Sequence, residues 1–201
     1  MILRFLLPKL TWNIKTNEKV IYLTFDDGPL PEITNFVLEQ LNNYKAKATF
    51  FCVGDNVSKH PAIFNQIISN GHVIGNHTFN HLKGWQTKDP IYFENIAKSE
   101  ELYQNQMKKT SELFRPPYGR IKKSQSRELL KKYRIIMWDV LTCDYSAKIS
   151  PEKCLKRSIS KTIKGSIVVF HDSYKAEKNL RYVLPKYLEH FHNQGFEFKS
   201  L

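Results

Sequence analysis

The chain has 201 residues, of which 41% are hydrophobic and 25% are charged, and these values are ordinary for a globular protein. This length is enough for one sizeable core and short for two, so we expect a single domain over residues 1–201. No segment approaches the roughly 20 consecutive apolar residues that a membrane span requires, which argues against an integral membrane protein.

Lys and Arg number 31 against 19 Asp and Glu, which leaves a net charge of +12. An excess of this size can indicate a protein that binds nucleic acid. The basic residues are scattered in pairs, however, and no element interleaves them with aromatic residues. We therefore expect a solvated basic face, or a surface that gathers an anionic substrate, and no nucleic acid partner.

The first ten residues, MILRFLLPKL, are apolar but lack the features of an export signal. The apolar run is about half the usual length of a signal-peptide core, and no small-residue cleavage site follows it. With no export signal seen, the cytoplasm is the compartment that the sequence alone suggests, and the compartment stays open. Residues 1–18 are expected to form an N-terminal extension that packs on the domain. The three cysteines form no C-x-x-C pair, and an odd count leaves at least one thiol unpaired, so we expect reduced cysteines in or near the core.

Short apolar runs alternate with amphipathic segments through almost the whole chain. Apolar spacing predicts helices around residues 33–44 and 63–68, with Gly71 just past the end of the second. Ser150 and Pro151 begin a further helix that should stop at Gly165. The apolar runs predict seven strands, at residues 20–25, 48–53, 72–75, 112–114, 135–140, 166–171 and 196–201.

Strands that are continuously apolar and separated by helices indicate a parallel sheet that is covered on both faces or closed into a barrel. Seven such units in 201 residues predict a small, distorted and incomplete (β/α)7 barrel. In barrels of this kind, chemistry takes place at the C-terminal ends of the strands. Five of the seven predicted strand ends carry reactive side chains: Asp26 and Asp27, His77 and His81, Arg115 to Tyr118, Asp144, and His171.

The stretch TFDDGP places Asp26 and Asp27 side by side directly after the first predicted strand. Like charges this close raise each other's pKa unless a cation neutralises one of them. In NHTFNH, His77 and His81 are four residues apart, so on a helical turn both rings would lie on one face and reach a single ion. Two histidines and one aspartate would give Zn²⁺ or a similar divalent ion three ligands and leave positions open for water and substrate.

A histidine pair at this spacing is weak evidence alone, because exposed histidines are common on helices. The aspartate pair strengthens it, since a metal bound by one carboxylate lets the other stay ionised as a base beside it. His171 ends the run VVFH at the proposed barrel mouth, which favours chemistry over a core position. Asp144 could orient a histidine or only cap a loop. The remaining histidines are expected to be structural or on the surface: His60, His72, His190 and His192.

The stretch RPPYG could simply be a turn, because two prolines and a glycine set the direction of the backbone. A rigid turn would also hold the Tyr118 N–H where it can face a developing oxyanion. Arg115 would then be free to fix an aspartate, with a planar, two-point grip on the carboxylate.

Five stretches, TFDDGP, NHTFNH, RPPYG, WDVLTCDY and VVFHDS, resemble in order the motifs of the NodB-type polysaccharide deacetylases, carbohydrate esterase family four. The resemblance covers nearly the whole chain, from about residue 20 to residue 201. It implies a barrel enzyme that removes N-acetyl groups from the amino sugars of a chitin-, peptidoglycan- or poly-N-acetylglucosamine-like glycan. It also implies one divalent metal ion, zinc above all, with cobalt or nickel as alternatives.

The resemblance implies a role for each matching residue. Three would bind the metal: Asp27, His77 and His81. Five would take part in catalysis: Asp26 as general base, His171 as general acid, Arg115 as the group that holds the base, Asp144 as the group that tunes the acid, and Tyr118 through its oxyanion N–H.

The sequence departs from the family pattern at two positions that shape the acetyl pocket. Tyr145 follows Asp144 where the family usually has Trp, and Val169 stands where Leu is usual. An esterase that removes O-acetyl groups from a glycan is therefore an alternative. A glycan-binding module without activity is a second alternative, although such a module would be expected to have lost a metal ligand or the base. A non-haem iron oxygenase is a third, because it would use the same set of two histidines and one carboxylate. Family members commonly act at the cell envelope, whereas no export signal is seen here, so the compartment stays open.

Overall fold

The computed structural model describes residues 7–108 and 110–201. Its strands form one sheet in the order β5-β4-β3-β2-β1-β7-β6, and β8 also pairs with β1. All of these pairs are parallel. The strands are β1 (Val20–Asp27), β2 (Thr49–Cys52), β3 (Val73–Asn76), β4 (Leu113–Phe114), β5 (Arg134–Ile135), β6 (Val140–Leu141), β7 (Ile167–His171) and β8 (Glu197–Lys199).

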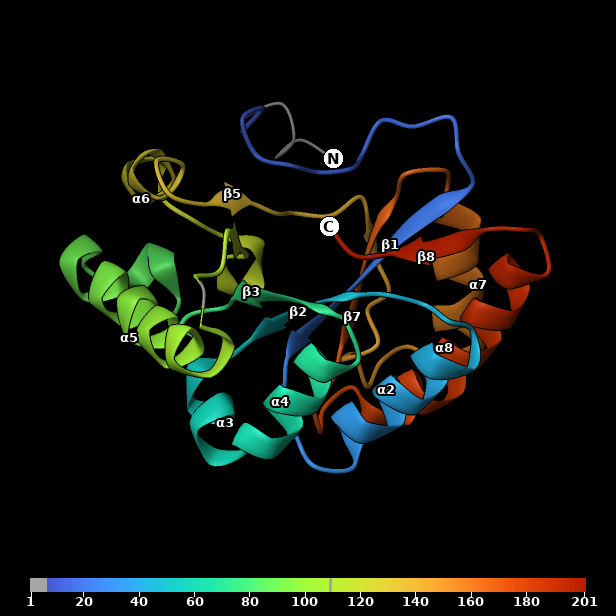
Figure 1. The fold of residues 1–201 in the computed structure, drawn as a ribbon. Coiled ribbons are helices and arrows are strands. Elements are labelled where there is room, and N and C mark those ends of the chain that lie inside the picture. The colour runs from blue at the N-terminus through green and yellow to red at the C-terminus, as the bar shows by residue number, and fades with distance from the viewer. Residues whose placement is uncertain (1–6, 109) are drawn as a thin grey trace.

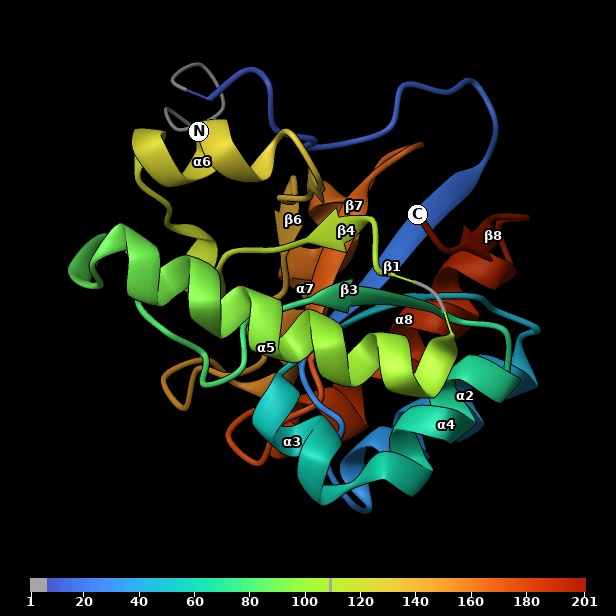
Figure 2. The same cartoon turned by 60° about the vertical axis from the view of Figure 1, so that its left-hand side comes forward.

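The sheet curls, and helices cover its outside, which confirms the predicted incomplete (β/α) barrel (Figures 1 and 2). The inner strands are apolar along most of their length because both of their faces are covered. β8 pairs with the first three residues of β1, and β2 pairs with its last four, so the two share one edge of β1.

One predicted strand, residues 135–140, is two strands in the structure. β5 pairs with β4 and β6 pairs with β7, which places them at opposite ends of the sheet order. Between them, the Ile136 N–H donates to the Phe114 carbonyl, and the Asp139 N–H donates to the Ile167 carbonyl. The segment therefore crosses from one edge of the curled sheet to the other, and a run of apolar letters cannot show such a crossing.

The helices are α2 (Ile33–Asn43), α3 (Gly54–Lys59), α4 (Pro61–Ser69), α5 (Asp89–Met107), α6 (Lys123–Leu129), α7 (Pro151–Lys161) and α8 (Glu177–His192), with the short 3₁₀ helices η1 (Gly84–Gln86) and η2 (Pro117–Gly119). α2, α4, α7 and α8 lie toward one flank of the sheet, and α5 and α6 lie toward the other (Figure 1). α2 and α4 confirm the two helices that apolar spacing predicted, and α7 confirms the helix predicted from Ser150 and Pro151.

The predicted helix ends are confirmed in part. The Ser150 hydroxyl accepts a hydrogen bond from the Lys153 N–H and caps α7 as expected. Gly71 has a φ of +75° just after α4, where a left-handed residue ends a helix. The prediction for Gly165 was wrong, because α7 ends at Lys161. Gly165, with a φ of +78°, instead turns the chain into β7, and a Cβ there would lie 1.8 Å from the Ile14 carbonyl oxygen.

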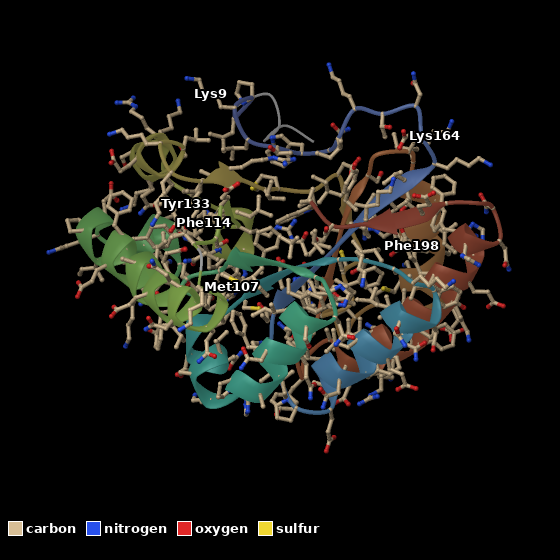
Figure 3. The ribbon with its side chains drawn as sticks, in the orientation of Figure 1. Lys9, Met107, Phe114, Tyr133, Lys164 and Phe198 are labelled. Carbon is tan, nitrogen blue, oxygen red and sulfur yellow. The ribbon has the colours of Figure 1, made fainter. Side chains whose placement is uncertain are left out.

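Two main apolar clusters hold the barrel together. The larger lies between the sheet and α2, α4 and α8, where Phe25 stacks between Phe50 and Phe170 at ring distances of 5.1 and 5.8 Å. The smaller contains Phe114 and Tyr133, which Figure 3 places on the side of α5, whereas Phe198 of the larger cluster lies on the opposite side. The sheet, whose strand ends carry the predicted site residues, is thus packed on both flanks.

Residues 7–18 contact the barrel, and residues 1–6 of the predicted extension lie outside the described residues. Leu10 and Trp12 are buried in the smaller cluster, and Thr11 forms a bridge with Ile136. The three cysteines are free and buried, as predicted. No helix in the described part of the chain is long and apolar enough to cross a membrane.

Candidate active site

The predicted site residues gather at the C-terminal ends of neighbouring strands. Six of the eight line one cleft of about 520 Å³: Asp26, Asp27, His77, His81, Tyr118 and His171. The other two, Arg115 and Asp144, are buried behind this lining. Asp26 and His171 are register partners on β1 and β7, so the sheet itself brings them together.

Asp27, His77 and His81 form the one cluster in the described part of the chain whose side-chain donors could hold a metal ion. Their ligand atoms all lie within 4.8 Å of one another. Asp27 Oδ1 is 3.3 Å from His81 Nε2 and 3.9 Å from His77 Nε2. One carboxylate and two imidazoles are a common catalytic donor set, so these residues fit a divalent ion.

Both histidines are kept in the form that can bind a metal. The His77 Nδ1–H donates to the Arg115 carbonyl at 2.7 Å, which leaves Nε2 as the free ligand atom. Burial lowers the pKa of His77 to about 4, despite the nearby aspartates. Burial also lowers the pKa of His81. Neutral imidazole is the ligating form, so near neutral pH the pair is ready to bind.

The predicted helical turn between the two histidines was wrong. Residues 77–83 have no regular secondary structure, and Thr78 and His81 both have positive φ, at 64° and 53°. Side-chain oxygens hold this loop in shape, since Asn76 Oδ1 accepts from the Thr78 N–H and Thr78 Oγ1 accepts from the Leu82 N–H. The two rings nevertheless come together, with centroids 5.0 Å apart.

Asp26 is buried beside Arg115, whose Nη1 lies 2.6 Å from Asp26 Oδ1. Burial raises the pKa of this carboxyl, but the charge of Arg115, with smaller contributions from His77 and His171, brings the pKa below its ordinary value. Asp26 is therefore ionised near neutral pH, in a position that opens on the cleft.

Arg115 holds Asp26 by one nitrogen only, so the expected two-point grip is not formed. Its Nη1 also donates to the Thr24 hydroxyl, and its Nε and Nη2 donate to the carbonyls of Ile136 and Met137. The guanidinium lies 4.1 Å from the centre of the Phe51 ring. These four contacts fix the Arg115 side chain, and Arg115 in turn sets the position of the Asp26 carboxylate.

His171 is held by Asp144 at two points. Its Nδ1 is 2.7 Å from Asp144 Oδ1, and its backbone N–H donates to Asp144 Oδ2 at 2.8 Å. Burial lowers the pKa of His171, but the Asp144 carboxylate outweighs that effect and the pKa rises to about 9. Asn179 in turn donates to the Asp144 carbonyl. His171 is therefore protonated near neutral pH, with Nε2 as the ring nitrogen that Asp144 does not engage.

The RPPYG turn places Tyr118 at the cleft in a left-handed conformation, with a φ of 61°. Its N–H makes no hydrogen bond to the described part of the chain, whereas the following Gly119 N–H is bonded to the Pro116 carbonyl. The Tyr118 ring lies 4.7 Å from His81 and 5.4 Å from Trp85. The turn thus places the Tyr118 ring beside His81 and leaves the Tyr118 N–H without a partner in the described part of the chain.

Sequence analysis missed several residues that shape the site. Asn56 lines the cleft and donates to the Asp27 carbonyl at 2.8 Å, which supports the unusual φ of 88° at Asp27. Trp138 and Leu141 form apolar parts of the lining. Trp138 lies in the stretch WDVLTCDY, so its signal was present, whereas nothing local marked Asn56.

Asp172 was also missed, although it directly follows His171. Its carboxylate is fully buried and accepts from the Gly28 N–H at 3.1 Å and from the Thr34 hydroxyl at 2.6 Å. Burial raises its pKa to about 7. A Cβ at Gly28 would lie 1.9 Å from Asp172 Oδ2, so only glycine fits there. This contact ties the TFDDGP turn to β7 and explains the glycine of that stretch.

The fold and the site define a polysaccharide deacetylase. The sequence model of the polysaccharide deacetylase family matches residues 13–137, and the chain belongs to this family. A peptidoglycan-N-acetylglucosamine deacetylase of Bacillus cereus is 33% identical over 193 residues, which cover 95% of this chain and 90% of the relative. A chitooligosaccharide deacetylase of Azorhizobium caulinodans is 32% identical over 170 residues, which cover 79% and 76% of the two chains.

A solved structure gives the same result. The crystal structure of the Bc1960 peptidoglycan N-acetylglucosamine deacetylase, in complex with a hydroxamate-type benzamide, superimposes with a TM-score of 0.90 at 29% identity. The superposition covers 96% of this chain and 91% of that chain. The chain is therefore an enzyme of the polysaccharide deacetylase class, as the five ordered motifs predicted.

Proposed function

We propose that the chain hydrolyses the N-acetyl groups of amino-sugar residues in a glycan, with one divalent metal ion at Asp27, His77 and His81. Zinc is the first candidate for this ion, because two imidazoles and a carboxylate suit it. The observation that carries the proposal is geometric: Asp26, paired with Arg115, and His171, paired with Asp144, are register partners at the mouth that also holds the Asp27, His77 and His81 cluster. Amide hydrolysis needs a base and an acid together.

A divalent ion held by Asp27, His77 and His81 would supply Lewis acidity for the attacking water and the acetyl carbonyl. The chain's own residues supply the proton transfers. Asp26, held ionised by Arg115, accepts a proton from the water as it attacks the carbonyl carbon. The free N–H of Tyr118 donates to the oxygen on which negative charge develops.

His171 acts on the other side of the reaction. The amine of a sugar is too basic to leave as an anion, so the nitrogen must gain a proton as the C–N bond breaks. His171 donates that proton, and the Asp144 carboxylate stabilises the imidazolium until it does. Acetate and a free amino sugar are then released.

A panel assay tests the proposal. We expect acetate release from N-acetylated glycans by protein loaded with Zn²⁺, Co²⁺ or Ni²⁺, and loss of that release after chelation. The panel contains N-acetylglucosamine oligomers, peptidoglycan fragments and an O-acetylated xylan. Release from the xylan alone would establish an O-acetyl esterase, and release from none of the metal-loaded samples would establish a protein without this activity.

A further inference from the structure

A tight turn after β7 forms one rim of the cleft beyond the catalytic groups. The Ala176 N–H donates to the Ser173 carbonyl at 2.9 Å, so Tyr174 and Lys175 stand at the tip of the turn. Asp172 and Ala176, on either side, are both fully buried. The two tip residues therefore project from a base that the core holds in place, and both line the cleft.

Tyr174 presents an exposed aromatic ring in the lining of the cleft. It is 68% exposed, and Tyr118 on the loop after β4 is 53% exposed. Among the described residues only two other large apolar side chains, Ile91 and Ile163, are noted as exposed to this degree, and neither lines the cleft. Aromatic rings present a flat apolar face with a polar edge, which suits the apolar face of a pyranose ring. The two tyrosines thus provide stacking surfaces after two different strands.

Lys175 adds a positive charge to the cleft, with the Tyr145 ring between it and His171. Its ammonium lies 5.6 Å from the centre of the Tyr145 ring, and that ring lies 4.9 Å from the His171 ring. Within the described ranges no carboxylate lies within 4.0 Å of this ammonium. The acidic groups of the cleft are already engaged, since Asp26 is bonded to Arg115 and Asp27 belongs to the metal cluster.

We propose that Tyr174 and Lys175 form a subsite for an acidic sugar, in which Tyr174 stacks on the ring and Lys175 binds a carboxylate that the glycan carries. This inference rests on the proposed function and narrows its substrate to glycans with carboxylates close to the reacting N-acetyl group. A polymer in which every second sugar bears a lactyl ether has this chemistry, and a neutral chitin-like polymer lacks it. The net charge of +12 favours the approach of such a polyanion.

Two substrates of matched shape test the charge. One is an oligosaccharide of alternating N-acetylglucosamine and lactyl-ether-bearing N-acetylglucosamine, and the other is the same oligosaccharide with each lactyl carboxylate converted to a methylamide. For the zinc-loaded native protein we expect a higher kcat/KM on the acid than on the amide, and a ratio that falls as salt rises. In Lys175→Met the acid-to-amide ratio should fall by about three- to tenfold, the range expected for a partly exposed charged contact.

Matched variants separate the subsite from general charge and from folding. Lys175→Arg keeps the cation and should retain most of the ratio. Lys186→Met is the control, because that lysine also lies over a tyrosine ring, Tyr182 at 4.7 Å, but on α8 and away from the cleft. It should leave the ratio unchanged. Tyr174→Ala should raise KM on both substrates more than it lowers kcat.

The proposal is overturned if Lys175→Met changes kcat/KM equally on acid and amide, or if the native protein prefers the amide. An equal loss in Lys186→Met would also overturn it, because the effect would then follow from net charge alone. Failure of the proposed function has a different signature, which is no acetate from either substrate with native, zinc-loaded protein.

Discussion

The two sides of the cleft are built in different ways. On one side, Asp26 and His171 end paired strands, and the register of β1 and β7 sets them next to each other. On the other side, His81 and Tyr118 stand in loops, and both have a positive φ. On the strand side, the sheet and one buried partner are enough to position each of the two side chains. On the loop side, the positions depend on backbone conformations that side-chain hydrogen bonds must hold.

This difference decides what each side can do. A side chain at a strand end is positioned by the backbone hydrogen bonds of the sheet. A buried partner can therefore shift its pKa without changing its position. A group on a loop can approach a ligand from a direction that no strand end offers. In the proposed mechanism the strand side holds the base and the acid, and the loop side supplies a metal ligand and the free N–H.

The largest expected effect is on the loop side. His81→Ala removes one of the three proposed ligands, so most bound zinc and most activity should be lost together. We expect kcat/KM to fall by roughly a thousandfold or more, because a bound metal would contribute several kcal/mol to the transition state. Zinc titration by calorimetry and acetate release measure the two losses. His190→Ala on α8, away from the cleft, is the control. A variant that keeps full zinc occupancy would remove His81 from the ligand set.

The next largest effect distinguishes Asp26 from His171 by comparing two substrates that have different leaving groups. An amide needs its amine protonated, but an activated aryl acetate releases a stable phenolate. His171→Ala should therefore lose far more kcat/KM on an N-acetyl sugar than on the aryl ester, while Asp26→Asn should lose on both, each by roughly 10²–10⁴-fold. Zinc content is checked in each variant first. Equal losses for His171→Ala on the two substrates would show that His171 is not the acid.

The two sides of the cleft could be predicted from the sequence to different degrees. Asp26 and His171 could be predicted both as site residues and as strand ends, because apolar runs and the polar residues that end them are visible in the chain itself. His77 and His81 could be predicted as site residues but not in their local structure, because the positive φ at Thr78 and His81 depends on partners such as Asn76. The crossing of residues 135–140 was missed for the same reason, since its hydrogen bonds go to distant strands.

Arg115 joins the two sides, and its replacement tests how. Arg115→Lys can keep one contact with Asp26 but cannot also reach the carbonyls of Ile136 and Met137, each of which would cost about 1–3 kcal/mol if left without a partner. We expect a folded protein with a lower midpoint of thermal unfolding and about 10- to 100-fold less activity. Thermal unfolding and acetate release give both values. An unchanged rate would mean that Arg115 only shapes the turn.

Asp144→Asn is expected to cause the smallest loss of rate and the clearest change in the pH dependence of activity. In the proposed mechanism protonated His171 is the acid, so activity of the native protein should fall as pH rises through about 9. Without the carboxylate, burial is left to lower the pKa of His171, and the falling limb should move to lower pH by one unit or more. Near pH 6 the loss of kcat/KM should be roughly tenfold, and it should grow steadily above that pH.

The same substitution has a stability signature of fixed sign. The folded pKa of His171 lies above its ordinary value of 6.5, so the protonated ring stabilises the native protein fully below about pH 6.5 and this contribution is lost as pH rises through about 9. The midpoint of thermal unfolding should therefore drop between those pH values in the native protein and much less in Asp144→Asn. Asp55→Asn, which breaks only a surface pair with Lys59, should keep the native pH dependence. If Asp144→Asn keeps both the native falling limb and the native drop in midpoint, the acid of this site must be tuned by a group other than Asp144.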